Sequence, residues 1–325
     1  MCMKVMCDDV APIPAEKAGV KAWFEQNVKS TQLNPVLQEA EKTRKVIKVG
    51  PNGDFKTITK AIASVPSGNK GRVIINLAKG EYNEKIKVER TKPFITFYGE
   101  PGTTLQAGGT AAKFGTLDSA SVIIESDYFI SYNIIFKNTA PRPTAEDTKK
   151  GSAGAQAVAL RASGDYAAFY ECKFIGFQDT LCDDKGGHLF MNCFIEGTVD
   201  FIFGSGKSLY LLSDIHVLKD THKTVITAQA KKEANEDSGY SFVHCNVNAD
   251  SPKEAHLGRG WFQRSTVVFS YSTMNDGIAP EGWEENKQPI MTLYFAEFQN
   301  QGPGATPEAR APFTKKLDAT TANLI

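Results

Sequence analysis

No stretch of this 325-residue chain is apolar over the roughly 18 residues that a membrane-spanning helix needs, and runs such as Val122–Ile124 are far shorter. Net charge is also missing: 37 basic residues balance 37 acidic ones, which leaves no overall field to attract nucleic acid or an anionic membrane. The opening Met1–Pro14 carries one lysine and no apolar core, so it lacks the pattern of a signal peptide. The sequence predicts a water-soluble protein that binds neither nucleic acid nor membrane.

Cysteine is scarce, and none of the six cysteines forms a C-x-x-C pair, which excludes a disulfide scaffold and gives no zinc-ligand spacing. They are Cys2, Cys7, Cys172, Cys182, Cys193 and Cys245. Cys172 and Cys193 occupy equivalent places in the repeat described below, so a disulfide and a pair of stacked free thiols are both open. The acidic run Asp183-Asp184 is expected to be a solvated turn rather than a calcium site. We therefore predict no cofactor and no metal.

Short β-rich runs recur along the middle of the chain, bounded by Gly, Asn and Asp. Six of them share the pattern aromatic-x-x-(small or aromatic)-x-apolar, at intervals of 40, 21, 20, 32 and 27 residues; they begin at Phe129, Phe169, Phe190, Tyr210, Phe242 and Phe269. An interval near 20 is too short for a β-α-β unit of ~30 residues, but it fits one coil of a parallel β-helix. An antiparallel sandwich also spaces its strands regularly and is the weaker alternative. The repeat predicts an all-β parallel β-helix with loops inserted at the longer intervals.

The two ends differ from the repeat and are expected to cap it with short helices. Ala15–Ser30 has helical spacing of apolar residues, and Asp54 followed by Phe55–Val65 has the pattern of an N-capped amphipathic helix that covers the open first coil. We predict an N-terminal extension over 1–45, the β-helix catalytic domain over 46–304, and a C-terminal tail over 305–325 that packs outside as helix and loop.

Four polar side chains fall into register once the repeat is recognised. Gln156 to Gln178 is 22 residues, Gln178 to Asp200 is 22, and Asp179 to Asp200 is 21. Stacked strands lie ~4.8 Å apart, so the two carboxylates are expected to face each other at roughly 5 Å. At that separation their pKa values are driven apart, so that one carboxyl is ionised while the other holds a proton. The glutamines can donate hydrogen bonds to a developing oxyanion.

These residues belong to a series of short motifs that resembles the signature of one enzyme family. The motifs, in chain order, are Gly80–Glu84, Gln156–Arg161, Gly176–Leu181, Asp200–Gly204 and Leu257–Trp261. Their order and intervals resemble those of plant pectin methylesterases (pectinesterases), from about Val46 to about Pro303. The resemblance implies a right-handed β-helix and an enzyme that hydrolyses the methyl esters of polygalacturonate to carboxylate and methanol.

The resemblance also implies a role for each catalytic residue. Asp200 matches the nucleophile that attacks the ester carbonyl. Asp179 matches the acid that protonates methanol and then the base that activates water. Gln178 matches the group that stabilises the oxyanion, assisted by Gln156. Burial beside a fixed cation would make a carboxylate a competent nucleophile, and Arg259 matches that cation.

Further residues match substrate contacts of the family. Thr116 falls where the family has a threonine that contacts substrate, and Trp261 matches a platform on which a sugar stacks. Phe201 and Tyr240 are further candidate groove residues. The resemblance implies methylesterified pectin as a partner, a pectinesterase inhibitor protein as another, and a secreted protein of the cell wall, the location being inferred from the substrate alone.

One residue departs from the family's pattern, and two other functions compete. Gly260 stands where the family has proline between Arg259 and Trp261, and a looser backbone is expected to misplace either side chain. A pectin-active glycosidase or lyase could also use paired carboxylates. A wall protein that binds pectin without activity is the non-enzymatic alternative. The absence of a G-x-S-x-G motif argues against a serine esterase.

Overall fold

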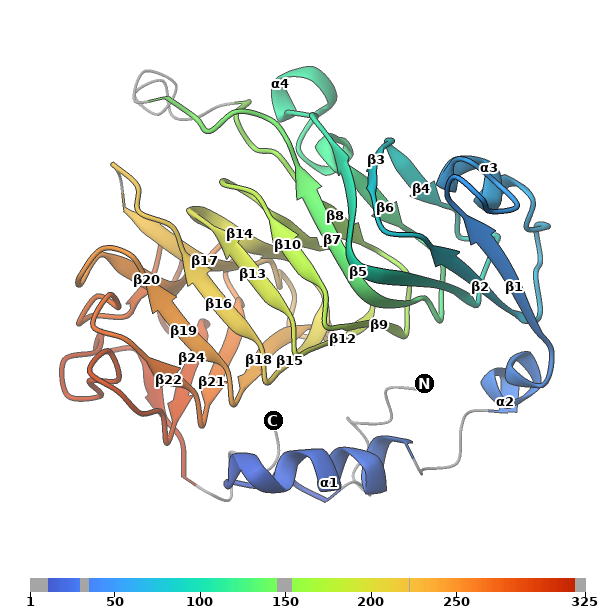
Figure 1. Ribbon diagram of the computed structural model, residues 1–325. Coiled ribbons are helices and arrows are strands. Elements are labelled where there is room, and N and C mark those ends of the chain that lie inside the picture. Colours follow the sequence, from blue (N-terminus) through green and yellow to red (C-terminus); the bar gives the residue numbers. More distant parts are fainter. Residues whose placement is uncertain (1–10, 30–34, 145–153, 222, 319–325) are drawn as a thin grey trace.

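The computed structural model describes residues 11–29, 35–144, 154–221 and 223–318. Of Met1–Pro14 only residues 11–14 lie within these ranges, and Cys2 and Cys7 lie outside them. Within it, parallel strands stack side by side from β1 at one end of the molecule to β24 near the other (Figure 1). The predicted β-helix is therefore confirmed, and it is right-handed.

The described strands form three parallel stacks, because each coil contributes up to three strands separated by bends. One stack forms an eight-stranded sheet: β4 (Ile86–Val88), β6 (Val122–Ile124), β8 (Leu160–Ala162), β11 (Leu181–Asp183), β14 (Val199–Gly204), β17 (Thr224–Gln229), β20 (Ala255–Arg259) and β23 (Trp283–Glu284). The other two stacks are joined into a second sheet by β5 and β7, two long strands that run through the bend between them.

The second sheet contains 17 strands among the described residues. One of its stacks holds β1 (Arg44–Val49), β2 (Arg72–Leu77), β5 (Ile95–Ala107), β7 (Ile130–Asn138), β9 (Ala167–Tyr170), β12 (Gly187–Met191), β15 (Lys207–Leu211), β18 (Gly239–Val243), β21 (Thr266–Ser270), β24 (Tyr294–Phe298) and β25 (Lys315–Lys316). The other holds β3 (Glu81–Asn83), β10 (Lys173–Ile175), β13 (Phe194–Gly197), β16 (Asp214–Val217), β19 (Asn246–Ala249) and β22 (Thr273–Met274), beside the later parts of β5 and β7.

The aromatic repeat is the ladder that fills the coil. Strand register aligns Phe169 with Phe190, and then in turn with Tyr210, Phe242 and Phe269, as predicted. Successive rings in this ladder stack with centroids 4.9, 4.7, 4.3 and 4.3 Å apart, close to the spacing of the strands that carry them. Each ring therefore buries its faces against the ring of the next coil.

In the first coil of the repeat, the sequence pattern places Phe129 level with Phe169, which is two residues away from the alignment in the structure. Ser131, and not Phe129, pairs with Phe169. The bend that follows explains the shift, because it recurs in the seven coils from β7 to β24 as a left-handed residue with φ between 48° and 55°: Asn133, Glu171, Asn192, Leu212, His244, Tyr271 and Gln299. Asn133 is thus the counterpart of Glu171, and a seventh coil that ends at Gln299 went unrecognised.

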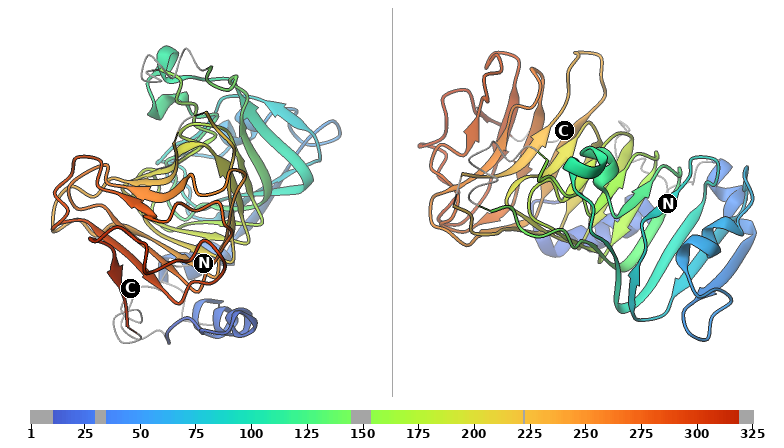
Figure 2. Two further views of the ribbon diagram at one scale, coloured as in Figure 1. Left: turned by 90° about the vertical axis from the view of Figure 1, so that its left-hand side faces the viewer. Right: turned by 90° about the horizontal axis from the view of Figure 1, so that it is seen from above.

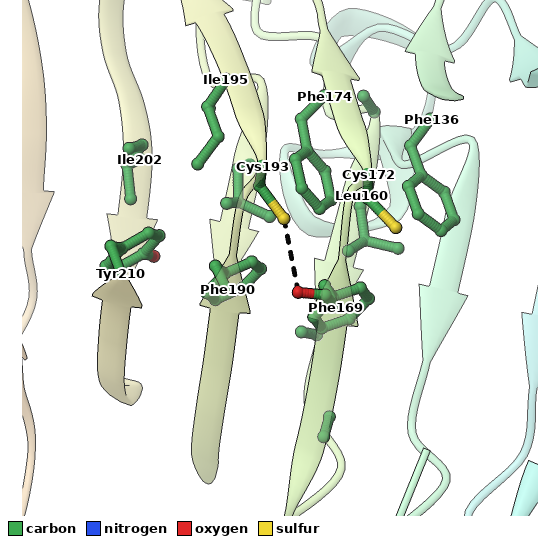
Figure 3. Close-up of a cluster of buried hydrophobic side chains, with 14 of the residues drawn as sticks. Phe136, Leu160, Phe169, Cys172, Phe174, Phe190, Cys193, Ile195, Ile202 and Tyr210 are labelled. Carbon is green, nitrogen blue, oxygen red and sulfur yellow. Dashed lines mark hydrogen bonds between the residues drawn. The ribbon is translucent and has the colours of Figure 1, made fainter. Parts of the chain in front are cut away.

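In the five coils from β9 to β21 the residue after this bend is small and buried, and three of the cysteines lie at this position. Cys172, Cys193 and Cys245 are free thiols, with Ser213 and Ser272 in the same column. The Cys193 thiol donates to Phe169 O at 3.4 Å (Figure 3). Burial raises the pKa of the Cys172 thiol to about 11, so the thiol is neutral. Of the two open possibilities, the structure has stacked thiols and no disulfide between Cys172 and Cys193.

Helices cover the start of the coil and one outer face. The segment η1 (Lys17–Gly19), α1 (Val20–Phe24) and η2 (Glu25–Lys29) confirms the predicted helical stretch, and α2 (Pro35–Lys42) follows it. Trp23 and Phe24 of α1 pack on the outside of the 17-stranded sheet, against side chains such as Tyr170 and Leu211. This helix lies on the opposite side of the coil from α4 (Ala111–Phe114) (Figure 2).

The predicted helix at Phe55–Val65 is shorter and has a different N-cap. It is α3 (Ile58–Ala63), and its N-cap Thr57 accepts a hydrogen bond from Lys60 N at 3.3 Å. Asp54 instead accepts from Lys48 N at 2.8 Å, so it holds a turn. Ile58 and Ile62 join the core of the first coils, as expected for a helix that closes an open coil end.

The described C-terminal residues contain no helix, so the predicted helix in the tail is wrong as far as residue 318. Instead, β25 pairs with β24 and extends the sheet by one short strand. Arg310 anchors the tail, because its Nε donates to Glu297 Oε1 at 2.6 Å and its Nη2 to Gly304 O at 2.7 Å. The domain boundaries proposed from the sequence stay predictions.

The acidic run expected to be a solvated turn is part of a buried charge network. Asp183 is fully buried, and its carboxylate lies 2.5 Å from His188 Nδ1 and 2.7 Å from the Tyr210 hydroxyl. Asp184 binds Arg161 at 2.9 Å. Burial is the largest single effect and lowers the pKa of His188, but the charge of Asp183 and the hydrogen bonds to Asp183 and Gly164 together outweigh it, so the net pKa is raised. Strand alternation explains the error, because β11 turns Asp183 into the coil.

Replacing His188 by Gln tests this network. The folded pKa of His188 lies above its unfolded value near 6.5. Its contribution to stability is therefore complete below pH 6.5 and is lost as the pH rises through the folded pKa. We expect H188Q to lower the free energy of unfolding by about 3 kcal/mol at pH 6. The difference from the unmodified chain should shrink above the folded pKa, as measured by guanidinium unfolding at a series of pH values. If the difference in free energy of unfolding between the two proteins does not change with pH, His188 is not charged in the folded state.

Candidate active site

The candidate site residues gather at one bend of the coil, because successive coils insert their loops there. The segments that precede β6 and β8 carry Thr116 and Gln156, the segment that precedes β11 carries both Gln178 and Asp179, and Asp200 lies within β14 itself. Arg259 reaches this bend from the end of β20, two strands farther along the same sheet.

The two aspartates are level with each other on adjacent coils. Leu181 pairs with Ile202, an offset of 21 residues, and Asp179 N donates to Val199 O at 3.1 Å. The predicted register of Asp179 and Asp200 is therefore confirmed. Both residues adopt the left-handed conformation, with φ of 62° and 49°, which aspartate tolerates better than most residues.

A β-bulge re-aims Asp200. The pairing of β14 with β17 shifts by one residue between Val199 and Ile202, so Asp200 and Phe201 together face a single residue, Ile226. Bulges bend a strand and redirect its side chains, and they recur beside active sites. Here the bulge and the left-handed backbone turn the Asp200 carboxylate toward Arg259.

Arg259 holds Asp200 through a two-pronged contact. Nε of Arg259 donates to Asp200 Oδ1 at 2.8 Å, and Nη2 donates to Oδ2. Asp200 is 5% exposed. Burial raises the pKa of Asp200, whereas the hydrogen bonds and charge of Arg259 lower it and keep the increase moderate. The pair is thus an ionised carboxylate fixed in orientation by a planar cation.

Asp179 has no such cation of its own and is the carboxyl that holds a proton. It is 8% exposed. Burial raises its pKa well above the usual range, and the neighbouring charge of Asp200 raises it further. Arg259 and a hydrogen bond from Gln178 oppose these effects only in part. The two aspartates therefore differ as a proton donor and an anion, which is the division of labour that acid and nucleophile require.

The glutamines flank this pair, one of them a residue out of the expected register. Ala157 N donates to Gln178 O and Ala159 N to Thr180 O, which brings Val158 level with Asp179 and Phe177 level with Gln156. Gln156 Oε1 accepts from Gly154 N at 3.0 Å, which leaves its NH2 as the donor end. Gln178 and Gln156 are both partly exposed beside the aspartates.

The proposed sugar contacts lie on both sides of the aspartates. Trp261 is 47% exposed, with its ring centroid 5.8 Å from Arg259 Cζ. Thr116 is partly exposed and starts the turn η3 (Leu117–Ser119). Ser119 Oγ donates to Thr116 O and accepts from Val158 N, so this turn is tied to the coil that carries Gln156.

Two aromatic candidates are not surface residues. Phe201 is fully buried in the core, and Tyr240 is also buried, with its hydroxyl donating to Asp183 O at 3.2 Å. Their assignment to the groove is therefore wrong. The left-handed Asp200 breaks the in-out alternation of β14, so the residue next to it turns inward.

Comparison with known proteins agrees with this geometry. The sequence model of the pectinesterase family matches residues 45–322. The chain belongs to the pectinesterase family. It is 48% identical over 324 residues to pectinesterase 1 of Olea europaea, covering 96% of this chain and 87% of that relative.

Solved structures of pectin methylesterases share the fold of this pectinesterase. The enzyme from carrot superposes with a TM-score of 0.78 at 32% identity, over 85% of this chain and 89% of the other. A pectin methylesterase in complex with a hexasaccharide superposes with a TM-score of 0.71 at 27% identity, over 85% of this chain and 94% of the other.

Sequence reasoning missed two residues that lie near the aspartates in the structure of this pectinesterase. Phe203 is partly buried on the outer face of β14, where it packs with Cys182 and Ile123. Glu284 lies opposite Arg259 in the pairing of strand β20 with strand β23, and its negative charge raises the pKa of Asp200. Phe203 could have been found by applying alternation after a bulge, but Glu284 lies outside every motif.

Gly260 is closely packed, contrary to the looseness expected of it. Its N–H donates to Glu284 O at 3.1 Å, and its carbonyl accepts from Asn286 Nδ2 at 2.9 Å. A Cβ added there would lie 2.8 Å from Glu285 O. Arg259 still reaches Asp200, so the predicted misplacement of this arginine is wrong, whereas the effect of Gly260 on activity stays a prediction.

Within the described ranges, no three His, Cys, Asp or Glu side chains are grouped as a metal site would require. In the same ranges, no helix has the length and apolar character needed to cross a membrane.

Replacing Arg259 by Gln should remove the cation that is paired with Asp200. Without that charge, burial raises the Asp200 pKa further, so the carboxylate becomes protonated at a higher pH. We expect the acidic limb of the pH profile of kcat/KM to move to higher pH and the maximum rate to fall about 10²-fold or more. Arg90→Gln, which removes a surface partner of Asp127, is the control. An unmoved acidic limb would contradict the pairing.

Replacing Gly260 by Ala should destabilise the fold through overpacking. We expect a loss of about 1–3 kcal/mol in the free energy of unfolding, because the new methyl group meets backbone atoms that cannot move alone. Gly80→Ala is the matched control, since nothing lies within 4 Å of a Cβ added at Gly80. Equal denaturation midpoints for the two variants would show that position 260 is not tightly packed.

Proposed function

We propose that this pectinesterase hydrolyses the methyl esters of homogalacturonan through a covalent intermediate on Asp200. The observation that carries the proposal is the contrast between two buried carboxyl groups on adjacent coils, one held as an anion by Arg259 and the other kept protonated by burial and by its neighbour. Pectin is favoured as substrate by the family and by the saccharide bound in a structural relative.

In the first step, an oxygen of Asp200 attacks the ester carbonyl carbon. The carbonyl oxygen becomes an oxyanion, which Gln178 and the NH2 of Gln156 stabilise by donating hydrogen bonds. Collapse breaks the bond to the methoxy oxygen, Asp179 gives that oxygen its proton, and methanol leaves. The galacturonyl group is then joined to Asp200 as an anhydride.

In the second step, Asp179 is ionised and accepts a proton from water as the water attacks the acyl carbon. The bond to Asp200 breaks, free galacturonate forms, and both aspartates return to their starting states. Splitting hydrolysis in this way replaces one difficult step by two easier ones. Thr116, Trp261 and Phe203 would hold the sugar chain across the aspartates.

The substrate class also leads to proposals about location and partners. Pectin lies in the plant cell wall, so we propose secretion to the wall as the site of action. A pectinesterase inhibitor protein is the proposed protein partner, and it would have to cover the aspartates between Trp261 and Thr116.

The proposal is tested by measuring methanol and acid released from methylated pectin. We expect Asp200→Asn and Asp179→Asn each to lower kcat by about 10³-fold or more, since each removes a group that takes part in bond making or proton transfer. Asp127→Asn, on the surface beside Arg90, should leave the rate unchanged. Chain cleavage without methanol would instead indicate a glycosidase or lyase, and binding without either product would indicate a pectin-binding protein.

A further inference from the structure

A short excursion of the chain, residues 109–119, stands beside the site and exposes unusual side chains. It contains α4 and η3, and α4 projects beyond the strands of the coil (Figure 1). Phe114 and Leu117 in this excursion are 39% and 41% exposed. Exposed apolar side chains that lie together on a surface mark binding sites, whereas single exposed apolar side chains are ordinary.

The base of the excursion is fixed by a buried amide. Asn138 is 4% exposed, and its Nδ2 donates to Gly109 O at 2.9 Å and to Ser119 O at 3.2 Å, the two ends of the excursion. The same nitrogen also donates to Val158 O at 2.9 Å. Because one side chain closes the loop and joins it to the neighbouring coil, the excursion is held in a defined position.

The excursion is also tied directly to the catalytic corner. Ala111 N donates to Gln156 O at 2.8 Å, and Ala112 N donates to Gly154 O at 2.9 Å. Side chains on α4 therefore lie next to the segment that carries Gln156. The coil of β6, which follows α4 in the chain, is three strands away from β14, which carries Asp200. At ~4.8 Å for each strand spacing, the side chains of α4 lie roughly 15 Å from Asp200 along the coil axis.

Two lysines surround the exposed ring. Lys85 Nζ lies 3.7 Å from the Phe114 centroid, and Lys113 Nζ lies 5.0 Å from it. The Lys85 ammonium also donates to Asp118 O, and the Asp118 carboxylate lies 3.6 Å from Arg161. We call Lys85, Lys113 and Phe114 the cationic platform. It combines an aromatic face with two ammonium groups held against it, which suits a sugar ring that bears a carboxylate.

We propose that the cationic platform binds a free galacturonate of the polymer several sugars away from the ester under attack. The inference rests on the proposed function. Hydrolysis turns a neutral ester into a carboxylate, so a chain gains affinity for the platform only where it has already been hydrolysed. The platform would thus make Lys85 and Lys113 specificity determinants that direct the enzyme to partly de-esterified chains. Trp261 would hold the chain on the other side of the aspartates.

The test compares initial rates on two substrates, highly methylated pectin and the same pectin partly saponified with alkali. In K85Q/K113Q we expect kcat/KM on the saponified substrate to fall about five- to tenfold, and on the highly methylated substrate to stay within about twofold. High salt should lower the preference of the unmodified enzyme in the same way, because exposed charges are screened. Lys173→Gln is the matched control, since Lys173 lies 6.0 Å from the Phe194 ring on the other sheet.

A binding measurement gives a second readout that does not need turnover. Calorimetric titration of Asp200→Asn with unesterified oligogalacturonate should show weaker binding when K85Q and K113Q are added. Equal losses on both pectins, or unchanged affinity, would overturn the platform. If no methanol is released from either substrate, the proposed function itself fails, and the titration still decides whether the platform binds uronate.

Discussion

The stacking of one coil on the next is the constraint on which the rest of this molecule depends. Parallel strands must lie side by side to pair their backbone groups, so a residue and its counterpart one coil later are brought within one strand spacing. Inside the coil, this rule builds the ladder from Phe169 to Phe269. At the bend it places Asp179 beside Asp200. Core and site are thus two results of one repeat.

Burial would disable the site if the charges were not matched to their surroundings. Two carboxylates in a poorly solvated corner cannot both be ionised at low cost. Arg259 offsets the charge of Asp200, and Asp179 keeps a proton instead. The same logic operates within the coil, where Asp183 is paired with His188 and bonded to Tyr210. The first arrangement leaves one carboxyl with a proton to give, whereas the second satisfies every carboxylate oxygen and joins strands of two sheets.

Backbone geometry turns these pairs in the right direction. Left-handed residues recur at one bend in the seven coils from β7 to β24, and Asp179 and Asp200 are also left-handed at the site itself. Strain of this kind persists where the surrounding structure holds it, and it clusters at functional positions. The bulge in β14 has two effects at once: it directs Asp200 outward to Arg259 and sends Phe201 into the core.

The sequence by itself determined the coil, the one-coil offset of the two aspartates, and the motifs that identify the family, because each depends on spacing along the chain. It could not decide which side of the coil a residue faces once a bulge or a left-handed bend interrupts alternation. Phe201 and Phe203 were misjudged or missed for that reason, whereas Asp183 follows the alternation of β11 and was misjudged because its strand was taken for a solvated turn. Nor could it find Glu284 or the cationic platform, since their partners come from distant coils. Only the tertiary structure brings such residues together, because packing between coils, and not spacing within one, sets those contacts.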